Sequence, residues 1–293
     1  MRILNFGSMN IDHVYRVEHL AGPGETLAAQ SYELRCGGKG LNQSVALAMA
    51  GAEVCHAGLV GAGGAQLRQR LEDSGVDCGC LGSTQEPSGH AVIQVDAQGE
   101  NAIVLFPGSN RALTRPYIDK VLSHFGSGDI LLLQNEINEL PYLIQRAADR
   151  AMDVALNAAP VDAELAACPL DRVRWLIVNQ VEAAALSGSR NPEECARILC
   201  RRWPQLELVL TLGEDGVYYR KGDFTLYIPA HRVKAVDSTG AGDTFIGYFL
   251  AAMADGADLG YALTLATTAA ALTVSRPGAA DAIPSLEEVL KTL

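Results

Sequence analysis

The sequence predicts an α/β protein whose mostly parallel sheet is covered by helices on both faces. Short apolar runs alternate along the chain with segments in which apolar residues recur at helical spacing. Strands that are joined through helices pair in parallel, because a parallel neighbour requires a crossover connection. The 293 residues, 48% of them hydrophobic and 19% charged, suffice for one large core or two medium ones and exclude a disordered chain.

The individual elements follow from these patterns. The expected buried strands are short apolar runs, at residues 3–6, 54–60, 130–134, 153–157, 175–179 and 208–212. The expected helices between them are amphipathic, at residues 42–50, 65–74, 140–151, 181–186 and 193–203. The C-terminal third is rich in helix, at residues 242–255, 259–274 and 285–293.

Two segments break this rhythm. Residues 12–36 alternate polar and apolar side chains, and residues 88–106 have the pattern of a hairpin with strands at 90–95 and 101–106. Half-polar strands fit poorly in a buried parallel sheet, so we expect a small separate sheet over one end of the main domain. A further hairpin, 217–220 and 224–228, is expected at the edge of the main sheet.

Composition narrows the range of partners. Lys and Arg total 23 and Asp and Glu 34, and the net charge of −11 argues against nucleic acid or an anionic membrane as the main partner. The least polar long stretch, residues 261–275, is too short to span a bilayer. The N-terminus turns polar too soon for a signal peptide, and the seven cysteines include no CxxC pair. We therefore expect reduced cysteines and a cytoplasmic protein.

Glycine is in surplus and marks places where backbone approaches a ligand. The chain has 29 glycines, about 10% of its residues against a usual ~7%. Gly240, Ala241 and Gly242 directly precede an apolar helix, whose first N–H groups and dipole favour an anion such as a transferred phosphoryl group. Asp243 follows in the first turn, where it could accept a proton from an attacking hydroxyl. The plainer alternative is that Asp243 only caps the helix.

A second glycine-rich segment, residues 37–44, opens the helix expected at 42–50. Its glycines allow close approach to a ligand, while Lys39 and Asn42 supply donors for hydroxyl groups. The alternative is an ordinary turn into a helix. Residues 58–64 are also rich in glycine, but they lack the register of a dinucleotide-binding fingerprint, which counts against a dehydrogenase.

Polar residues follow the expected strands, where ligands bind in open α/β sheets. They are Asn10, Asp12, Glu136, Asn179, Glu182 and Thr211. Together with residues 37–43 and 237–243, these positions resemble the motifs of the PfkB or ribokinase-like family of carbohydrate kinases over essentially the whole chain. The resemblance implies a three-layer α/β/α core with a mostly parallel sheet, formed by residues 1–11, 37–87 and 107–293. It also implies a β-sheet lid, formed by residues 12–36 and 88–106, that commonly joins two copies as a homodimer.

The resemblance assigns roles residue by residue. Asp243 is similar to the catalytic base of the family, and Gly240, Ala241 and Gly242 to its anion hole. The substrate-binding set, which also includes Asp243, is Asn10, Asp12, Gly38, Lys39, Asn42 and Glu136. An uncharged sugar covered with hydroxyls suits such carboxylates and amides. Taken singly, Asp12 and Glu136 could equally be solvated loop acids.

The resemblance also implies ATP, Mg²⁺ and K⁺. The positions similar to ATP contacts are Asn179, Thr211, Gly213, Gly216 and Thr267. Glu182 is similar to the residue that organises Mg²⁺, through water; the alternative is a first-turn acid favoured by the helix dipole. The positions similar to the monovalent-cation site, some acting through backbone carbonyls, are Asp237, Thr239, Thr273, Arg276 and Gly278. The sequence departs from the family at Ala282, where serine is usual, and at Thr267, where His or Asn often lines the adenine pocket.

The expected function is therefore ATP-dependent phosphorylation of a primary hydroxyl of a sugar. D-ribose, giving ribose 5-phosphate, is the first expectation because Lys39, Asn42 and Glu136 match the ribokinase members of the family. A nucleoside, deoxyribose, fructose or a ketodeoxy-sugar acid are the alternatives within the family. An alternative of another class is a non-catalytic regulator that binds nucleotide or sugar; the intact Asp243 and anion hole count against it.

Overall fold

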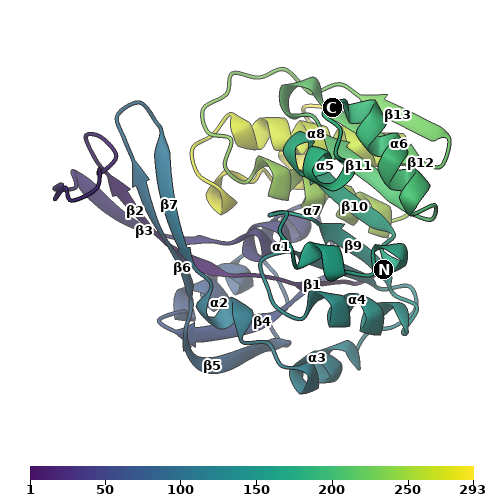
Figure 1. Cartoon of the computed structure of the whole chain (residues 1–293), viewed down its shortest axis with the longest axis horizontal. Coiled ribbons are helices and arrows are strands. Elements are labelled where there is room, and N and C mark those ends of the chain that lie inside the picture. Colours follow the sequence, from purple (N-terminus) through teal and green to yellow (C-terminus); the bar gives the residue numbers. More distant parts are fainter.

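A sheet of nine strands organises the molecule, in the order β13-β12-β11-β10-β9-β8-β1-β4-β5 (Figure 1). The computed structural model describes all residues 1–293. The seven strands β11-β10-β9-β8-β1-β4-β5 pair in parallel. At the other edge β12 pairs antiparallel with β11, and β13 pairs antiparallel with β12. The strands are β1 (Ile3–Phe6), β4 (Val54–Ala62), β5 (Leu81–Pro87), β8 (Ile130–Gln134), β9 (Asp153–Asn157), β10 (Trp175–Asn179), β11 (Glu207–Thr211), β12 (Val217–Lys221) and β13 (Phe224–Ile228).

Helices cover both faces of this sheet, as the sequence predicts. Successive strand residues point to opposite faces, so Ile3 belongs to one buried apolar cluster and Leu4 to the other. The helices that contribute to the Ile3 cluster are α1 (Lys39–Met49), α2 (Ala65–Asp73), α7 (Ala241–Ala254), α8 (Leu259–Val274) and α9 (Leu286–Leu290). Those that contribute to the Leu4 cluster are α3 (Arg115–Leu122), α4 (Leu140–Ala148), α5 (Gln180–Ser187) and α6 (Pro192–Arg202). No helix is long and apolar enough to cross a membrane.

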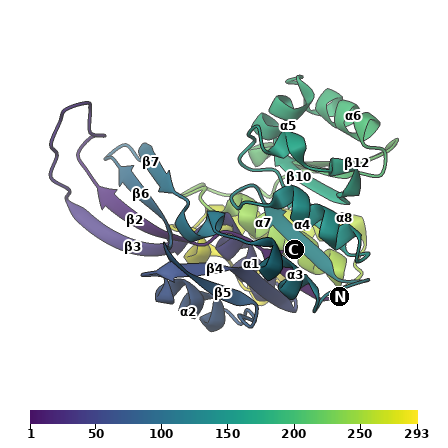
Figure 2. The same ribbon diagram turned by 60° about the horizontal axis from the view of Figure 1, so that its bottom comes forward.

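A separate sheet of four strands projects from one end of the main body, seen on the left of Figure 1 and again in Figure 2. Its order is β3-β2-β6-β7, and its strands are β2 (Asn10–Arg16), β3 (Ser31–Gly37), β6 (Gly89–Val95) and β7 (Asn101–Phe106). Pairing between β2 and β6 is parallel, while the other two pairs are antiparallel. The separate sheet expected from the half-polar segments is therefore present.

The structure departs from the expected elements in a few places. The strand β5 and the helix α3 were not predicted, because β5 carries few strand-forming residues and α3 is short and has Pro116 in its first turn. The helix α1 begins at Lys39 rather than at residue 42. A Cβ on Gly40 would lie 2.6 Å from the Cα of Gly7, so the glycine in this first turn allows α1 to pack directly against the segment that follows β1. The helix expected over 285–293 spans only Leu286–Leu290.

Candidate active site

The two glycine-rich segments meet at the side chain of Asp243. This residue lies in the first turn of α7, only 8% exposed, after Gly240, which adopts a left-handed conformation with φ 76°. The Oδ2 atom of Asp243 accepts a hydrogen bond from Asn42 Nδ2 at 3.0 Å, and Oδ1 accepts one from Gln43 Nε2 at 2.8 Å. Both donors lie on α1. The carboxylate is thus held between two helices at the carboxyl edge of the sheet.

The N-terminus of α7 presents backbone N–H groups beside this carboxylate. An α-helix leaves its first N–H groups without partners inside the helix. Ala241 directs its N–H to the carbonyl of Ser238 at 3.3 Å, whereas Gly242 and Asp243 follow as the next donors along the turn. A Cβ on Gly242 would meet nothing within 4 Å, so the space beside this turn is open. The arrangement suits an anion next to Asp243.

A cavity of 220 Å³ opens in front of this helix end. Residues named from the sequence that line it come from four separate segments of the chain; they are Lys39, Asn179, Glu182, Thr211, Gly240, Gly242 and Asp243. Asn157, Ser238 and Ile246 also line it and were not predicted. Asn157 ends β9, so its place at the end of a strand was the available sequence signal. Gly213, Gly216 and Thr267 are not among the lining residues.

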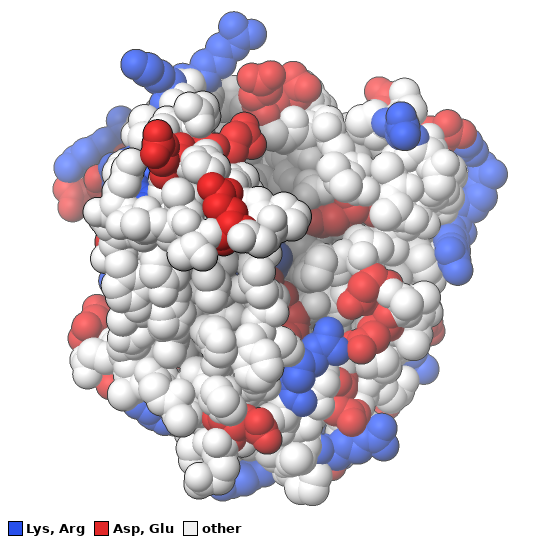
Figure 3. Space-filling view, turned by 60° about the vertical axis from the view of Figure 1, so that its left-hand side comes forward, with Lys and Arg blue, Asp and Glu red and all other residues white.

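Lys39 is surrounded by carboxylates in this cavity. Burial alone would lower the pKa of its ammonium group, but Asp243, Glu136 and Glu182 more than offset that effect and raise the pKa above its usual value. The side chain is therefore a permanent positive charge at neutral pH. It is the cationic group of a site that is otherwise acidic, and Figure 3 shows acidic groups around the hollow of the molecule.

A second group of polar residues lies beside Asp243 on the side of the small sheet. The Oε2 atom of Glu136 accepts hydrogen bonds from Ser8 Oγ and from the backbone N–H of Lys39. Burial raises the pKa of Glu136. Asp12, on β2, lies against Gly37, where any Cβ would overlap its carboxylate. Burial and the nearby charge of Glu136 raise the pKa of Asp12 to about 7.

Asn10 and Gly38 belong to the same region. Asn10 is buried, and its Oδ1 accepts a hydrogen bond from Asn110 Nδ2 at 2.8 Å. Asn110 also bonds both backbone groups of Met9, so it fixes the segment between β1 and β2. Gly38 has a φ of 93°, which only glycine adopts readily, and it caps the start of α1. Ser8 and Asn110 were missed as supporting residues: Ser8 stands in the same motif as Asn10 but was given no role, and Asn110 stands in no recognisable motif.

Asn179 and Glu182 form a reciprocal cap at the start of α5. Asn179 Oδ1 accepts from the N–H of Glu182 at 2.9 Å, and Glu182 Oε2 accepts from the N–H of Asn179 at 2.9 Å. Glu182 is therefore an acid in the first turn of its helix and part of its cap, which is the alternative to a magnesium-organising residue. Both residues still line the cavity. In α8 the hydroxyl of Thr267 donates to the carbonyl of Leu263 at 2.6 Å, so it is satisfied within its own helix.

The loop before α7 is organised by Asp237. Its Oδ1 accepts from the N–H of Thr239 at 2.9 Å, and its Oδ2 accepts from the N–H of Gly278 at 3.0 Å. Thr273 is fully buried and directs its hydroxyl to Thr244 and Ala269, away from this loop. The guanidinium of Arg276 pairs with Glu288. The structure thus joins Asp237, Thr239 and Gly278 directly, whereas the side chains of Thr273 and Arg276 bond elsewhere.

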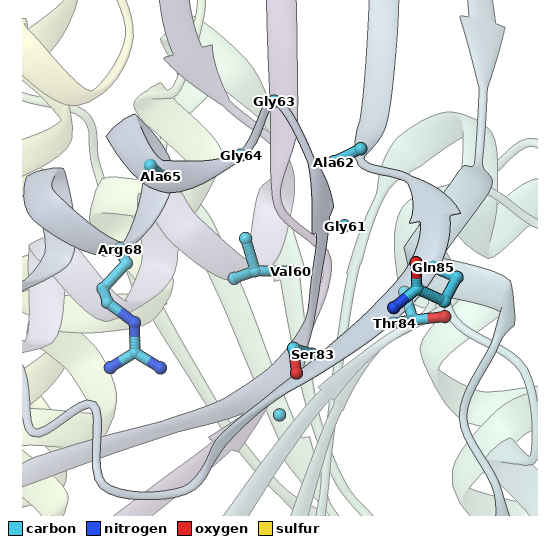
Figure 4. Close-up of a pocket in the computed structure, with 11 residues that line it drawn as sticks. Val60, Gly61, Ala62, Gly63, Gly64, Ala65, Arg68, Ser83, Thr84 and Gln85 are labelled. Atoms are coloured by element: carbon cyan, nitrogen blue, oxygen red, sulfur yellow. The ribbon is translucent and has the colours of Figure 1, made fainter.

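A larger cavity of 480 Å³ lies elsewhere, between β4, β5 and the start of α2 (Figure 4). Gly61, Ala62, Gly63 and Gly64 line one side of it, and Arg68 is its one charged lining residue. No carboxylate, histidine or cysteine lines this cavity. It therefore offers no group that could act as a general base, and the smaller cavity at Asp243 is the candidate active site.

Comparisons with known proteins identify the family of this chain. A model described as pfkB family carbohydrate kinase matches residues 2–286. The ribokinase of Haemophilus influenzae is 33% identical over 296 residues, covering 98% of this chain and 96% of that protein. The solved ribokinase of Thermotoga maritima has a TM-score of 0.89 at 33% identity, covering 99% of this chain and 98% of that chain. The ribokinase of Arabidopsis thaliana, solved with ribose and ATP, has a TM-score of 0.85 at 27% identity, over 99% of this chain and 97% of that chain. This chain belongs to the pfkB family of carbohydrate kinases.

Proposed function

We propose that this protein transfers the γ-phosphoryl group of ATP to a primary hydroxyl of a sugar, with D-ribose as the acceptor. The observation that carries the proposal is the position of Asp243. Its carboxylate is bonded to Asn42 and lines the 220 Å³ cavity together with Gly242, in the first turn of α7. A base, an anion site and a side chain that can donate a hydrogen bond to a hydroxyl thus lie close together, as phosphoryl transfer to an alcohol requires.

In this proposal Asp243 accepts the proton of the attacking hydroxyl as the hydroxyl oxygen bonds to the γ-phosphorus, while the bond from that phosphorus to the β,γ-bridging oxygen breaks and ADP leaves. The N–H groups that follow Gly240 stabilise the charge on the transferred group, with Gly240, Ala241 and Gly242 forming the anion hole. Lys39, held positive by its carboxylate neighbours, lies within the same cavity and offsets charge between the two substrates. The small sheet, which we take as a lid over residues 12–36 and 88–106, excludes water that would compete with the sugar.

The choice of ribose rests on the chemistry of the acceptor side. Asn10, Asp12, Asn42 and Glu136 offer carboxylates and amides, which recognise neutral hydroxyl groups, and Gly38 leaves room for close approach. Asp12 and Glu136 together would repel the carboxylate of a ketodeoxy-sugar acid, and Lys39 is the one cation to set against them. The ribokinases that this chain resembles support the same choice.

ATP would be held by the cavity residues Asn179 and Thr211, with Gly213, Gly216 and Thr267 farther along its path. Mg²⁺ fits beside Glu182: both oxygens of this carboxylate already accept bonds from Asn179, so an ion would be held through water, as Mg²⁺ prefers. The ion would supply neutralisation of phosphate charge. A K⁺ ion fits the loop of Asp237, Thr239 and Gly278, with carbonyls of Thr273 and Arg276; Ala282 can offer only its backbone.

We further propose a homodimer formed through the lid. The strand β7 is exposed along its whole length, and the side chains of Leu34, Val92 and Val104 lie in one row across the sheet through His13. Val104 is 71% exposed. Such an apolar face is unusual on a monomer and is typical of an interaction surface. A cytoplasmic location, the compartment we propose, is supported by seven cysteines that are all free thiols.

The test is an ADP-release assay over a panel of acceptors, with and without K⁺. The panel contains D-ribose, deoxyribose, fructose, a nucleoside and a ketodeoxy-sugar acid. We expect the highest kcat/KM with D-ribose. Preference for another acceptor would overturn the choice of ribose, and absence of turnover with every acceptor would favour the non-catalytic regulator.

A further inference from the structure

We infer that Gln43 is a positioning residue for Asp243, and that a buried chain of amide side chains fixes the direction in which it points. This inference rests on the proposed role of Asp243 as the base. Gln43 is fully buried, and its Nε2 donates to Oδ1 of Asp243 at 2.8 Å. That bond turns Oδ1 into the protein interior and leaves Oδ2, the partner of Asn42, as the oxygen that receives the proton.

The series of hydrogen-bonded amide side chains continues from Gln43 through the core of the sheet. Gln134, at the end of β8, donates from Nε2 to Gln43 Oε1 at 2.7 Å and to Asn5 Oδ1 at 2.9 Å. Asn5, on β1, donates from Nδ2 to the backbone carbonyl of Gly40 at 2.8 Å and to Ser44 Oγ at 2.8 Å. All of these polar side chains are 0% exposed. Water therefore does not compete for their bonds.

The direction of every amide in the chain follows from one backbone group. The carbonyl of Gly40 can only accept, so Asn5 must turn its NH₂ group toward it and its oxygen toward Gln134. Gln134 must then turn its own NH₂ group toward Asn5 and Gln43. Gln43 is left with its oxygen toward Gln134 and its NH₂ group toward Asp243. A flip of any one amide would bring two acceptors together.

The side chain of Gln43 has a second acceptor that supports the same direction. Nε2 also donates to Asn157 Oδ1 at 3.2 Å, and Asn157 donates in turn to the carbonyl of Ile177. At the far end of the chain, burial lowers the pKa of His56 to about 4, so the imidazole that bonds Ser44 is neutral. The charge of Asp243 is thus the one formal charge on this network.

Burying such a network lowers the free energy of unfolding unless its polar groups are paired. Buried amides lose their hydration, and Gln134 Oε1 has no hydrogen-bond partner at all. Apolar side chains would fill the same space without that cost. The network ends on the carboxylate proposed as the base. We infer that these buried polar groups orient that carboxylate toward the acceptor.

The test compares kcat and KM of the full-length protein with D-ribose and ATP. Gln43→Leu removes the donor at nearly constant size, and Gln43→Glu keeps the shape but replaces the donor by an oxygen. We expect kcat to fall by about 10- to 100-fold in both variants. KM for ribose should change by less than about threefold, because Gln43 is fully buried and does not line the cavity. Gln69→Leu, on the exposed face of α2, is the matched control and should leave both constants unchanged.

The possible results separate the inference from the function on which it rests. Retention of kcat within about twofold in either variant, or a rise in KM at constant kcat, would overturn the role of Gln43. Loss of the fold in both variants, judged by thermal unfolding, would make Gln43 a structural residue and overturn it as well. If the unaltered protein transfers phosphate to no acceptor, the proposed function itself fails, and the inference fails with it.

Discussion

Asn42 donates a hydrogen bond to the carboxylate of Asp243 at 3.0 Å, although 201 positions separate the two residues in the chain. The residue proposed to hold a sugar hydroxyl is therefore already bonded to the residue proposed to deprotonate one. A hydroxyl bound by Asn42 would be within reach of Oδ2 of Asp243 without any rearrangement of α1 or α7. This contact joins acceptor binding and proton transfer in one place.

Replacing Asp243 by Asn should abolish turnover while leaving both substrates bound. The amide keeps the size of the carboxylate but cannot accept a proton, and loss of a general base costs about 10²- to 10⁴-fold in kcat. Steady-state kinetics with calorimetric binding of ATP and ribose would measure this. Asp255→Asn, an exposed acid just beyond the same helix, is the control and should keep its activity. A rate near that of the unaltered protein in Asp243→Asn would refute the assignment.

Sugar binding should weaken as pH falls through neutrality. Burial and the charge of Glu136 raise the pKa of Asp12 to about 7, so near pH 6 only about a tenth of the free protein carries the ionised form. If the carboxylate accepts sugar hydroxyls, kcat/KM for ribose falls by up to about tenfold between pH 8 and pH 6. Asp12→Asn should lower kcat/KM at pH 8 and flatten the profile over this range. An unchanged profile would exclude Asp12 from sugar binding.

The same shift predicts how Asp12 affects stability. The folded pKa lies above the unfolded value of 3.8, so the folded state binds more protons between about pH 4 and pH 7. The free energy of unfolding therefore decreases as pH rises through this window, because ionisation of Asp12 costs more in the folded state. Asp12→Asn should raise Tm at pH 8 and have little effect on it near pH 4. Calorimetric scans at the two pH values check this, and a lower Tm at pH 8 would contradict it.

Glu207 should contribute to stability but not to catalysis. It is 4% exposed at the start of β11 and accepts bonds from Trp175, Tyr219 and Lys221 at 2.7 to 2.9 Å. Glu207→Gln should cost about 1–3 kcal/mol at pH 7, because it leaves buried donors poorly matched. Since the active site lies at the other ends of the strands, kcat of the folded variant should be unchanged.

The loss of stability caused by Glu207→Gln should depend on pH in a defined direction. Burial opposes ionisation of Glu207, but the bonds from Lys221 and Tyr219 and the charge of Arg174 more than offset it, so the pKa is lowered. The stabilisation is present above the unfolded pKa, near 4.5, and is lost as pH falls through the lower folded value. Urea unfolding at pH 7 and at acid pH should show the gap between Glu207→Gln and the unaltered protein shrink. A gap that grows on acidification would refute this account.

A charge in the middle of the exposed lid face should separate the proposed dimer. Val104→Asp puts a carboxylate at a position that is 71% exposed and flanked by apolar side chains across the sheet. Light scattering after size-exclusion chromatography should show a monomer. Phe224→Asp, at an exposed position on β13, an edge strand of the nine-stranded sheet, is the control and should leave the mass unchanged. The dimer proposal fails if the unaltered protein is already a monomer.

Part of the candidate site was open to prediction from the sequence because its members stand in local motifs. Asp243 follows a run of small residues, and Lys39 and Asn42 stand in a glycine-rich segment. Asn110 was missed because a single polar residue in a loop looks the same whether or not a site lies beside it. Ser8 stands beside Asn10 and Asn157 ends a strand, but neither position by itself shows what the side chain bonds. Gln43 stands in the same glycine-rich segment, but the sequence assigns it no role, since its partner Asp243 is 200 positions away.

By itself the sequence determined the class of the fold and the separate small sheet, and it indicated the segments that we propose to carry the chemistry, because hydrophobic period and glycine placement are local properties of a chain. Only the tertiary structure decided that Gly40 lies in a helix, that β5 pairs with β4, and which atoms bond Asp243. These outcomes depend on contacts between distant segments. No local pattern records the direction of a buried amide, because that direction is imposed by partners which meet only when the sheet and its helices have packed.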